Sequence, residues 1–506
     1  MMKFDTRAAP YLYWEAPQDG APTLWVSADH RTEPAVQSAM NHCFKHHRDA
    51  VLRPVPLDEL RELQQQQAAQ LPVDAGDISA QQAKVISYFG EAAKRRASDI
   101  HFLIGLEGLT KVQMRIHGDL ETLNPLEMDV GMSLASTIVL SMCDVTEKSF
   151  NPKRQQDGRV RRDFLQGLGL FGARYAHTPT EFGLYVVMRI LPDDGDNVPS
   201  MTDLGFLSTQ QRLINRMLAT PEGVIIMSGP TGSGKSTSLR TFSQIYLVHT
   251  GGRKRLLTIE DPPEGRIPGA VQTPIIADKN DPEAVSYAWV RAISASLRLD
   301  PDSIIIGEIR DANSAKSTLS ASRSGHLVLA TTHANSSIGI LDRLTDSFDI
   351  RPGEVMDPQM MVGLLSQRLV QVLCPHCKMS WPQKKDSLTD DQLALLARFC
   401  DTERLAFRNY QGCEHCHKGV VGRKVIAEVI RPDATFMHLL RHEGKMAARS
   451  YWVHTLGGIT RGMHLQIYLR DGLVDPLDAD AISPLDEDSL TLLPAPEKKE
   501  PAHAHA

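Results

Sequence analysis

A glycine-rich stretch that carries a lysine followed directly by two hydroxyl residues is the part of this chain best suited to chemistry. Four apolar residues, Val224 to Met227, predict a short buried strand that runs directly into a sequence of the form G-x-x-x-x-G-K-[ST]. Consecutive backbone N–H groups of such a loop point inward at phosphate oxygens. The sequence therefore predicts a phosphate-binding loop that comprises Gly229, Pro230, Thr231, Gly232, Ser233, Gly234, Lys235, Ser236 and Thr237.

Three features of this loop suit it to a nucleotide with Mg²⁺. Lys235 brings a cation to the β- and γ-phosphates, and the Ser236 hydroxyl can bind Mg²⁺. A helix expected from about Ser236 to Leu247 places its positive N-terminal end at the same anion. The strand, the lysine and the hydroxyl all stand where this mechanism needs them.

Acidic residues and a histidine follow later strands. The apolar strand at 256–259 leads into three carboxylates, of which Glu264 could orient or deprotonate the attacking water. A β-branched strand ends at Glu308, which beside Ser236 would hold the Mg²⁺ shell. The strand that begins near Gly325 ends at His333, which could contact a γ-phosphate. Each acid alone could equally be a solvated loop residue, and a lone histidine is more often structural.

Four of the seven cysteines form two C-x-x-C pairs, Cys374 with Cys377 and Cys413 with Cys416. Two such pairs suit tetrahedral Zn²⁺ held by four thiolates, around a loop without an obvious core of its own. His376 and His415 could replace a thiolate, and free buried thiols are the alternative. Four cysteines leave no ligand position open, so the sequence predicts a structural zinc site.

Composition limits the class of protein. The chain has 506 residues, 42% of them hydrophobic, which suits a globular protein of two to four domains. A net charge of −6 and a pI near 6.3 give no support for binding a polyanion. The N-terminus has no apolar signal core, and the longest apolar run, near 134–143, is too short to cross a bilayer. We therefore expect a cytoplasmic protein that meets membranes only through partners.

Hydrophobic periodicity and turn-rich segments divide the chain into five parts. We expect an adaptor region at 1–75, a small α+β domain at 79–191 and a polar linker at 192–200. Strands that alternate with helices predict an α/β nucleotide domain at 201–474, which includes the zinc element at 370–423. The Pro- and acid-rich segment 475–506 is expected to be disordered.

Taken together, the motifs resemble those of the ATPases of type II secretion systems and type IV pilus assembly. The likeness covers roughly residues 80 to 470. It rests on seven motifs in order: Ala97-Ser-Asp-Ile-His, Gln156-Asp-Gly-Arg159, the phosphate-binding loop, the acidic stretch Thr258–Glu264, Asp300–Asp311 with its Gly-Glu-Ile-Arg-Asp, Gly325–His333, and the paired cysteines followed by Gly422-Arg423.

The resemblance implies a fold and roles for single residues. It implies a RecA-like motor domain preceded by a PAS-like domain, six subunits in a ring, and ATP, Mg²⁺ and Zn²⁺ as cofactors. By this likeness Glu264 polarises the attacking water, Glu308 supports the metal through its waters, and His333 senses the γ-phosphate. Arginines of the PAS-like domain reach over the nucleotide in this family, and the matching positions are Arg174 and Arg189, with Arg159 nearby.

The implied function is that of a motor, peripheral at the inner membrane, that drives a platform protein so that pilin-like subunits join a filament. A type II secretion ATPase and a pilus-retraction motor are alternatives within the family, although retraction relatives lack the tetracysteine element. A nucleic-acid motor is the rival from another class, against which stand the acidic pI and the lack of an aromatic and basic stripe. A scaffold that binds nucleotide without turnover is disfavoured because both Glu264 and Glu308 are present.

The chain departs from the family pattern in three places. Pro263 stands where the family usually has an aliphatic residue, and the motif around His333 reads Ala-Thr-Thr-His-Ala-Asn. Neither difference removes a functional group. The N-terminal region is shorter than the docking domain of many assembly ATPases, so its partner is expected to differ.

Overall fold

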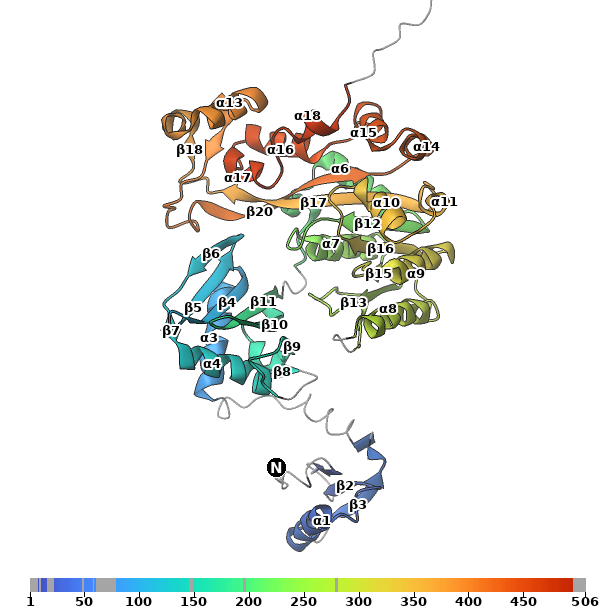
Figure 1. Cartoon of the computed structure of the whole chain (residues 1–506). Coiled ribbons are helices and arrows are strands. Elements are labelled where there is room, and N and C mark those ends of the chain that lie inside the picture. Colours follow the sequence, from blue (N-terminus) through green and yellow to red (C-terminus); the bar gives the residue numbers. More distant parts are fainter. Residues whose placement is uncertain are drawn as a thin grey trace, which may run out of the picture. The chain divides into compact units, whose positions relative to one another are not determined.

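The computed structural model describes residues 8, 11–15, 22–47, 50–57, 59–60, 79–144, 149–193, 197–277 and 281–494. Contacts divide the chain into two compact units, Met1–Ser79 and Ala80–Ala506, whose elements are labelled in Figure 1. Within the described ranges, no helix has both the length and the apolar character needed to span a bilayer.

The described part of the first unit contains a small sheet and the helix α1 (Pro34–His46). Strands β1 (Leu12–Glu15) and β2 (Thr23–Ser27) pair antiparallel, and β3 (Val51–Val55) pairs parallel to β2. A parallel partner requires a crossover, and α1 provides it. The strands and this helix enclose a small core of Leu12, Leu24, Val26, Val36 and Cys43.

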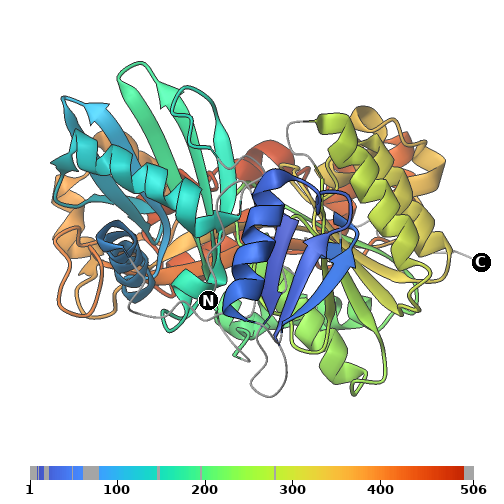
Figure 2. The same ribbon diagram turned by 90° about the horizontal axis from the view of Figure 1, so that it is seen from below.

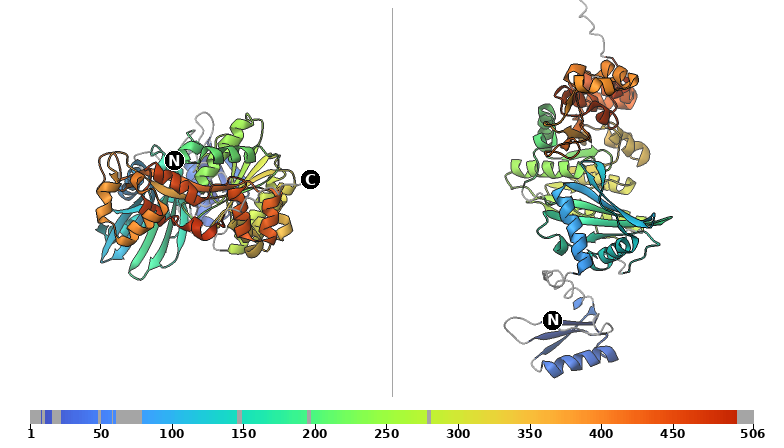
Figure 3. Two further views of the ribbon diagram at one scale, coloured as in Figure 1. Left: turned by 90° about the horizontal axis from the view of Figure 1, so that it is seen from above. Right: turned by 90° about the vertical axis from the view of Figure 1, so that its left-hand side faces the viewer.

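The second unit begins with an antiparallel sheet, which we call the antiparallel region (residues 80–193). Its strand order is β6-β5-β4-β11-β10-β9-β8. Helices α3 and α4 contact these strands, and in Figure 2 α4 (teal) lies across the sheet, as α3 (blue) does on the right of Figure 3. The elements are α3 (Ala80–Lys94), β4 (Ala97–Leu106), β5 (Leu109–Ile116), β6 (Asp119–Thr122), β7 (Leu126–Glu127), α4 (Met128–Thr137), β8 (Cys143–Asp144), β9 (Gln156–Val160), β10 (Leu170–Thr180) and β11 (Gly183–Pro192).

One strand of this region is shorter than its sequence predicts. The sequence of residues 158–164 predicts an extended segment throughout, but β9 ends at Val160. A turn of 3₁₀ helix, Arg162–Leu165, follows and buries Phe164 and Leu165. The sequence does not reveal this because the two apolar side chains face the core from a helical turn rather than from alternate strand positions.

The rest of the second unit, the mixed-sheet region (residues 197–494), is built on a seven-stranded sheet of order β14-β13-β15-β16-β12-β17-β20. All neighbours are parallel except β17 and β20. Its central strands are continuous apolar runs because helices cover both faces. The elements up to β17 are α5 (Met201–Leu204), α6 (Ser208–Leu218), β12 (Gly223–Ser228), α7 (Lys235–His249), β13 (Leu256–Glu260), β14 (Val271–Pro274), α8 (Pro282–Ser296), β15 (Ser303–Ile306), α9 (Ala312–Arg323), β16 (Leu327–Thr332), α10 (Gly339–Asp342), α11 (Pro352–Val355) and β17 (Met361–Leu373).

Parallel pairing gathers the chemistry at one edge of this sheet. Strands β12, β13, β15 and β16 run in one direction, so their carboxyl ends meet there. Buried β-branched and aliphatic side chains fix the register, with Ile226 opposite Ala330 and Ile259 opposite Ile306. Each predicted functional loop follows one of these ends.

Two further groups of elements complete the chain. A cysteine-bearing excursion between β17 and β20 (Val420–Ile430), where the zinc element is expected, contains β18 (Met379–Ser380), α12 (Trp381–Lys384), α13 (Asp390–Phe399) and β19 (Ala406–Phe407). The C-terminal helices, red on the left of Figure 3, are α14 (Ala434–His442), α15 (Lys445–His454), α16 (Arg461–Arg470), α17 (Pro476–Asp480) and α18 (Glu487–Thr491).

The C-terminal segment corrects one expectation. We expected 475–506 to be disordered, but residues 475–494 are folded and include α17 and α18. Some acidic side chains of this segment, which the local sequence suggests are exposed to solvent, have buried basic partners. For example, Arg461 Nη2 lies 2.5 Å from Glu487 Oε1. Composition alone could not reveal such long-range pairs. Residues 495–506 lie outside the described part of the chain.

A fully buried carboxylate holds the C-terminal helices to the sheet. Glu428 of β20 lies 2.8 Å from Arg449 Nη1 and accepts a hydrogen bond from the Ser337 hydroxyl at 2.7 Å. Burial raises the pKa of Glu428, but the charges of Arg449 and Arg461 outweigh it and hold the pKa below its ordinary value. The stability that Glu428 contributes is therefore fully present at pH values above the pKa of an unfolded glutamate, about 4.3. It is lost as the pH falls through the lower pKa that Glu428 has in the folded protein.

Arg449→Met is expected to lower the free energy of unfolding by about 3–5 kcal/mol, because it leaves the Glu428 charge buried without its main partner. Urea denaturation measures this loss. Lys445→Met on the same helix breaks the exposed pair with Asp342 and should cost under about 1 kcal/mol. Equal effects of the two substitutions would contradict a special role for the buried pair.

Candidate active site

The loop predicted to bind phosphate joins β12 to α7 as expected. Gly232 and Gly234 adopt φ values of 79° and 85°, which L side chains rarely adopt. Ser233 N–H closes a turn onto Pro230 O at 3.2 Å, and α7 begins at Lys235 rather than Ser236. The loop therefore has the backbone conformations that turn successive N–H groups toward an anion.

Lys235 and the two predicted carboxylates occupy one charged site. Lys235 Nζ donates to Gly229 O at 2.6 Å and to Pro230 O at 3.1 Å. Burial lowers the pKa of Lys235, and the negative charges of Glu308 and Glu264 partly offset this shift. Both carboxylates therefore lie within electrostatic reach of the lysine, although they follow different strands.

Glu264 contacts an arginine from the antiparallel region. Arg174, in β10, places Nη2 3.1 Å from Glu264 Oε1 and donates to Pro262 O at 3.1 Å. Each side chain of this pair is 31% exposed, so the contact is open to water and to a ligand. The arginine thus bridges from one sheet to the loop that carries the predicted catalytic carboxylate of the other.

Glu308 is held by His333 and by an arginine that the sequence analysis did not single out. His333 Nε2 lies 2.9 Å from Glu308 Oε1, and Arg310 Nε lies 2.7 Å from Glu308 Oε2. Arg310 Nη1 also reaches Asp261 Oδ2 at 2.9 Å. The motif Gly-Glu-Ile-Arg-Asp could have indicated the pair with Glu308, because positions 308 and 310 are two apart and so lie on one side of an extended segment. The pair with the distant Asp261 could not be predicted from the sequence.

The other two arginines predicted to lie near the nucleotide have different partners in the described structure. Arg189 donates to Asp99 Oδ1 at 3.2 Å. The guanidinium of Arg159 lies 5.6 Å from the centre of the Phe171 ring. The structure therefore brings Arg174 to Glu264 and places Arg189 against an acid of its own sheet.

A cavity of about 790 Å³ opens beside the outer face of the loop. The loop residues 230–233 line it, together with Arg368 and Gln371 of β17 and the turn 117–119 between β5 and β6. The cavity thus borders both sheets of the second unit.

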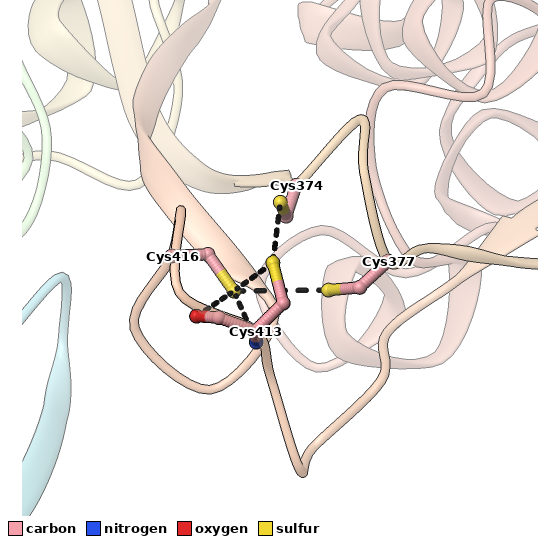
Figure 4. Close-up of side chains that lie close together, drawn as sticks. All are labelled: Cys374, Cys377, Cys413 and Cys416. Carbon is pink, nitrogen blue, oxygen red and sulfur yellow. Dashed lines mark hydrogen bonds between the residues drawn. The ribbon is translucent and has the colours of Figure 1, made fainter.

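The four predicted cysteines converge, as Figure 4 shows. Sulfur–sulfur distances are 3.7 Å for Cys374–Cys413, 3.7 Å for Cys377–Cys416 and 3.6 Å for Cys413–Cys416. A Zn²⁺ ion about 2.3 Å from each of four tetrahedral ligands requires sulfurs about 3.8 Å apart. The cluster therefore fits Zn²⁺. Backbone N–H groups of Cys413 and Gly419 point at the Cys416 sulfur, which suits a thiolate.

Comparison with known families agrees with these features. Residues 76–461 match the family described as "Type II/IV secretion system protein". The chain belongs to this family. The match includes the whole phosphate-binding loop, the three strand-end residues Glu264, Glu308 and His333, and all four clustered cysteines.

Two relatives illustrate the similarity. The chain is 35% identical over 368 residues to the type IV pilus assembly ATPase PilB of Thermus thermophilus, a match that covers 72% of this chain and 38% of the relative. It is 33% identical over 346 residues to the type II secretion system protein E of Klebsiella pneumoniae, with 68% and 64% covered. The chain thus spans less than two thirds of the length of either relative.

The fold of this family member is also found among solved structures. The crystal structure of the pilus retraction motor PilT with bound ADP superposes with a TM-score of 0.52 at 22% sequence identity. The match covers 79% of this chain and 97% of PilT. This likeness concerns the fold.

Proposed function

We propose that this protein is an ATP-hydrolysing motor of a type IV pilus assembly machine. The observation that carries the proposal is the convergence of Lys235, Glu264 and Glu308 at one end of a parallel sheet, beside a loop shaped for phosphate. In this account the mixed-sheet region is the RecA-like motor domain and the antiparallel region is PAS-like.

Each residue has one task in the proposed reaction. Backbone N–H groups of the loop and Lys235 hold the β- and γ-phosphates, and Glu264 orients and deprotonates the attacking water. The Ser236 hydroxyl and, through waters, Glu308 would hold Mg²⁺, which would neutralise charge on the phosphates. His333 reports the state of the γ-phosphate through its 2.9 Å contact with Glu308.

Arg174 offers a way to couple hydrolysis to motion. It belongs to the antiparallel region but pairs with Glu264 of the mixed-sheet region. An arginine that stabilises transferred charge only when two domains close makes turnover depend on closure. Arg189 would join it only by leaving Asp99, so its proposed role at the nucleotide requires a rearrangement of that pair.

The proposed assembly is a homohexamer that lies at the periphery of the inner membrane and acts on a platform protein there. We expect no nucleic acid among its partners. The names of the relatives support either pilus assembly or type II secretion. The four-cysteine cluster favours these over retraction, because it is the feature that the resemblance ties to assembly and export.

Lys235→Ala at the native locus is expected to abolish motor function, because the phosphate chain loses its half-buried cation. Electron microscopy of the cell surface, with a secretion assay, reads the outcome. Loss of filaments supports pilus assembly, whereas exoproteins trapped in the periplasm with filaments unchanged would assign the motor to type II secretion. Extra filaments would indicate retraction, and no phenotype would contradict the motor.

A further inference from the structure

Gln367 is a buried side chain that contacts the phosphate-binding loop from a different strand. It lies in β17, which pairs with β12, and only 1% of it is exposed. Its Nε2 donates to Ser233 O at 2.7 Å, and its Oε1 accepts from the Ser238 hydroxyl at 3.0 Å. The orientation of the amide is fixed by chemistry, because a carbonyl oxygen can only accept. One carboxamide therefore ties the loop to the first turns of α7.

The bond to Ser233 O determines where the next N–H group points. In a planar trans peptide, the C=O of one residue and the N–H of the next point in opposite directions. A carbonyl of Ser233 held toward Gln367 therefore turns the Gly234 N–H away from Gln367. In a phosphate-binding loop that opposite direction is the interior, where the N–H groups meet the anion.

The side of the loop that faces Gln367 has no room for other side chains. A Cβ at Gly229 would stand 2.4 Å from Gln367 O, and one at Gly234 would stand 3.3 Å from Gln367 Nε2. The first and last glycines of the motif thus pack against this one residue. Ser233 is 3% exposed, so its carbonyl depends on the protein for a hydrogen-bond donor.

We infer that Gln367 is a positioning residue for the phosphate-binding loop. It supplies the donor that keeps the Ser233 carbonyl outside the loop and the Gly234 N–H inside. The inference rests on the proposed binding of nucleotide at this loop. It adds a residue that does not touch the nucleotide but sets the affinity for its phosphates.

Gln367→Glu tests this, because glutamate has the same shape but as a carboxylate cannot donate to Ser233 O. At pH 8 the purified full chain with this substitution is expected to bind Mg-ADP about tenfold more weakly than the wild type, the loss that corresponds to one hydrogen bond of about 1.4 kcal/mol. A protonated carboxyl regains a donor. The ratio of the variant and wild-type dissociation constants should therefore shrink toward one as the pH falls to about 5.5, because burial raises the pKa of a carboxyl.

Gln210→Glu is the matched control. Gln210 is 2% exposed and donates to Ala427 O at 2.7 Å, as Gln367 does to Ser233 O, but it belongs to α6 and contacts β20. Both variants are expected to lower the melting temperature, and only Gln367→Glu should weaken Mg-ADP binding. Unchanged affinity of Gln367→Glu, equal weakening in the control, or a ratio independent of pH would overturn the inference. Failure of the wild type to bind Mg-ADP would instead refute the proposed function.

Discussion

Glutamine in place of Glu264 is expected to leave ATP binding intact and to slow ATP hydrolysis by about 10²- to 10⁴-fold, the usual contribution of a general base. An amide keeps the size of the side chain but cannot take a proton from water. The ion pair with Arg174 at 3.1 Å is also lost. The nucleotide should bind because the loop and Lys235 are unchanged. Equilibrium binding of ATP and steady-state phosphate release, measured on the same preparation, separate the two effects.

Glu260→Gln provides the control for this prediction. Glu260 is the last residue of β13, the strand that precedes Glu264. Its Oε1 already accepts hydrogen bonds from the Thr258 hydroxyl at 2.6 Å and from Gln272 Nε2 at 3.0 Å. Its substitution should leave turnover near the wild-type rate. Normal turnover in Glu264→Gln would show that another group activates the water.

Removal of Zn²⁺ is expected to unfold the two cysteine loops and to lower the melting temperature of the protein. Structural zinc binding contributes about 10–16 kcal/mol in small zinc peptides at pH 7. Here the effect should be local, because the segment between the cysteine pairs has a core that the sequence did not reveal. Leu396 and Phe407 pack with Leu465 and Tyr468 of α16. Hydrogen exchange before and after chelation should show lost protection near 374–378 and 409–420.

A matched pair of cysteine substitutions checks the assignment of the ligands. Cys413→Ser removes a cluster ligand and should abolish stoichiometric zinc in elemental analysis. Cys400→Ser, at the end of α13, changes a half-buried thiol outside the cluster and should retain one zinc per chain. A wild-type protein without zinc, whose melting curve does not respond to a chelator, would contradict the proposed metal site.

Local patterns in the sequence predicted part of the site, namely the lysine, the two carboxylates and the histidine that follow the strands of the parallel sheet. A parallel sheet brings the carboxyl ends of its strands together. Lys235, Glu308 and His333 each follow an apolar run, so we could expect them to lie near one another without knowing the order of the strands. The cysteine pairs were equally legible, because two short spacings define a tetrahedral cluster wherever the chain between them goes.

Contacts between distant segments could not be predicted. Arg310 pairs with Asp261 across 49 positions, and Gln367 reaches Ser233 across 134. The acids near the C-terminus resembled a solvated tail, but Glu487 and Asp488 meet buried arginines of α15 and α16. In each case the partner depends on which strands and helices are neighbours, and periodicity within a segment does not specify that.

Phosphate release from Mg-ATP by the purified full chain shows directly whether this site hydrolyses ATP. We expect Mg²⁺-dependent release by the wild type and none above background by Lys235→Ala, prepared and assayed alongside it. Release that is absent from the wild type, or equal in the two proteins, would contradict the assignment of ATP hydrolysis to this site.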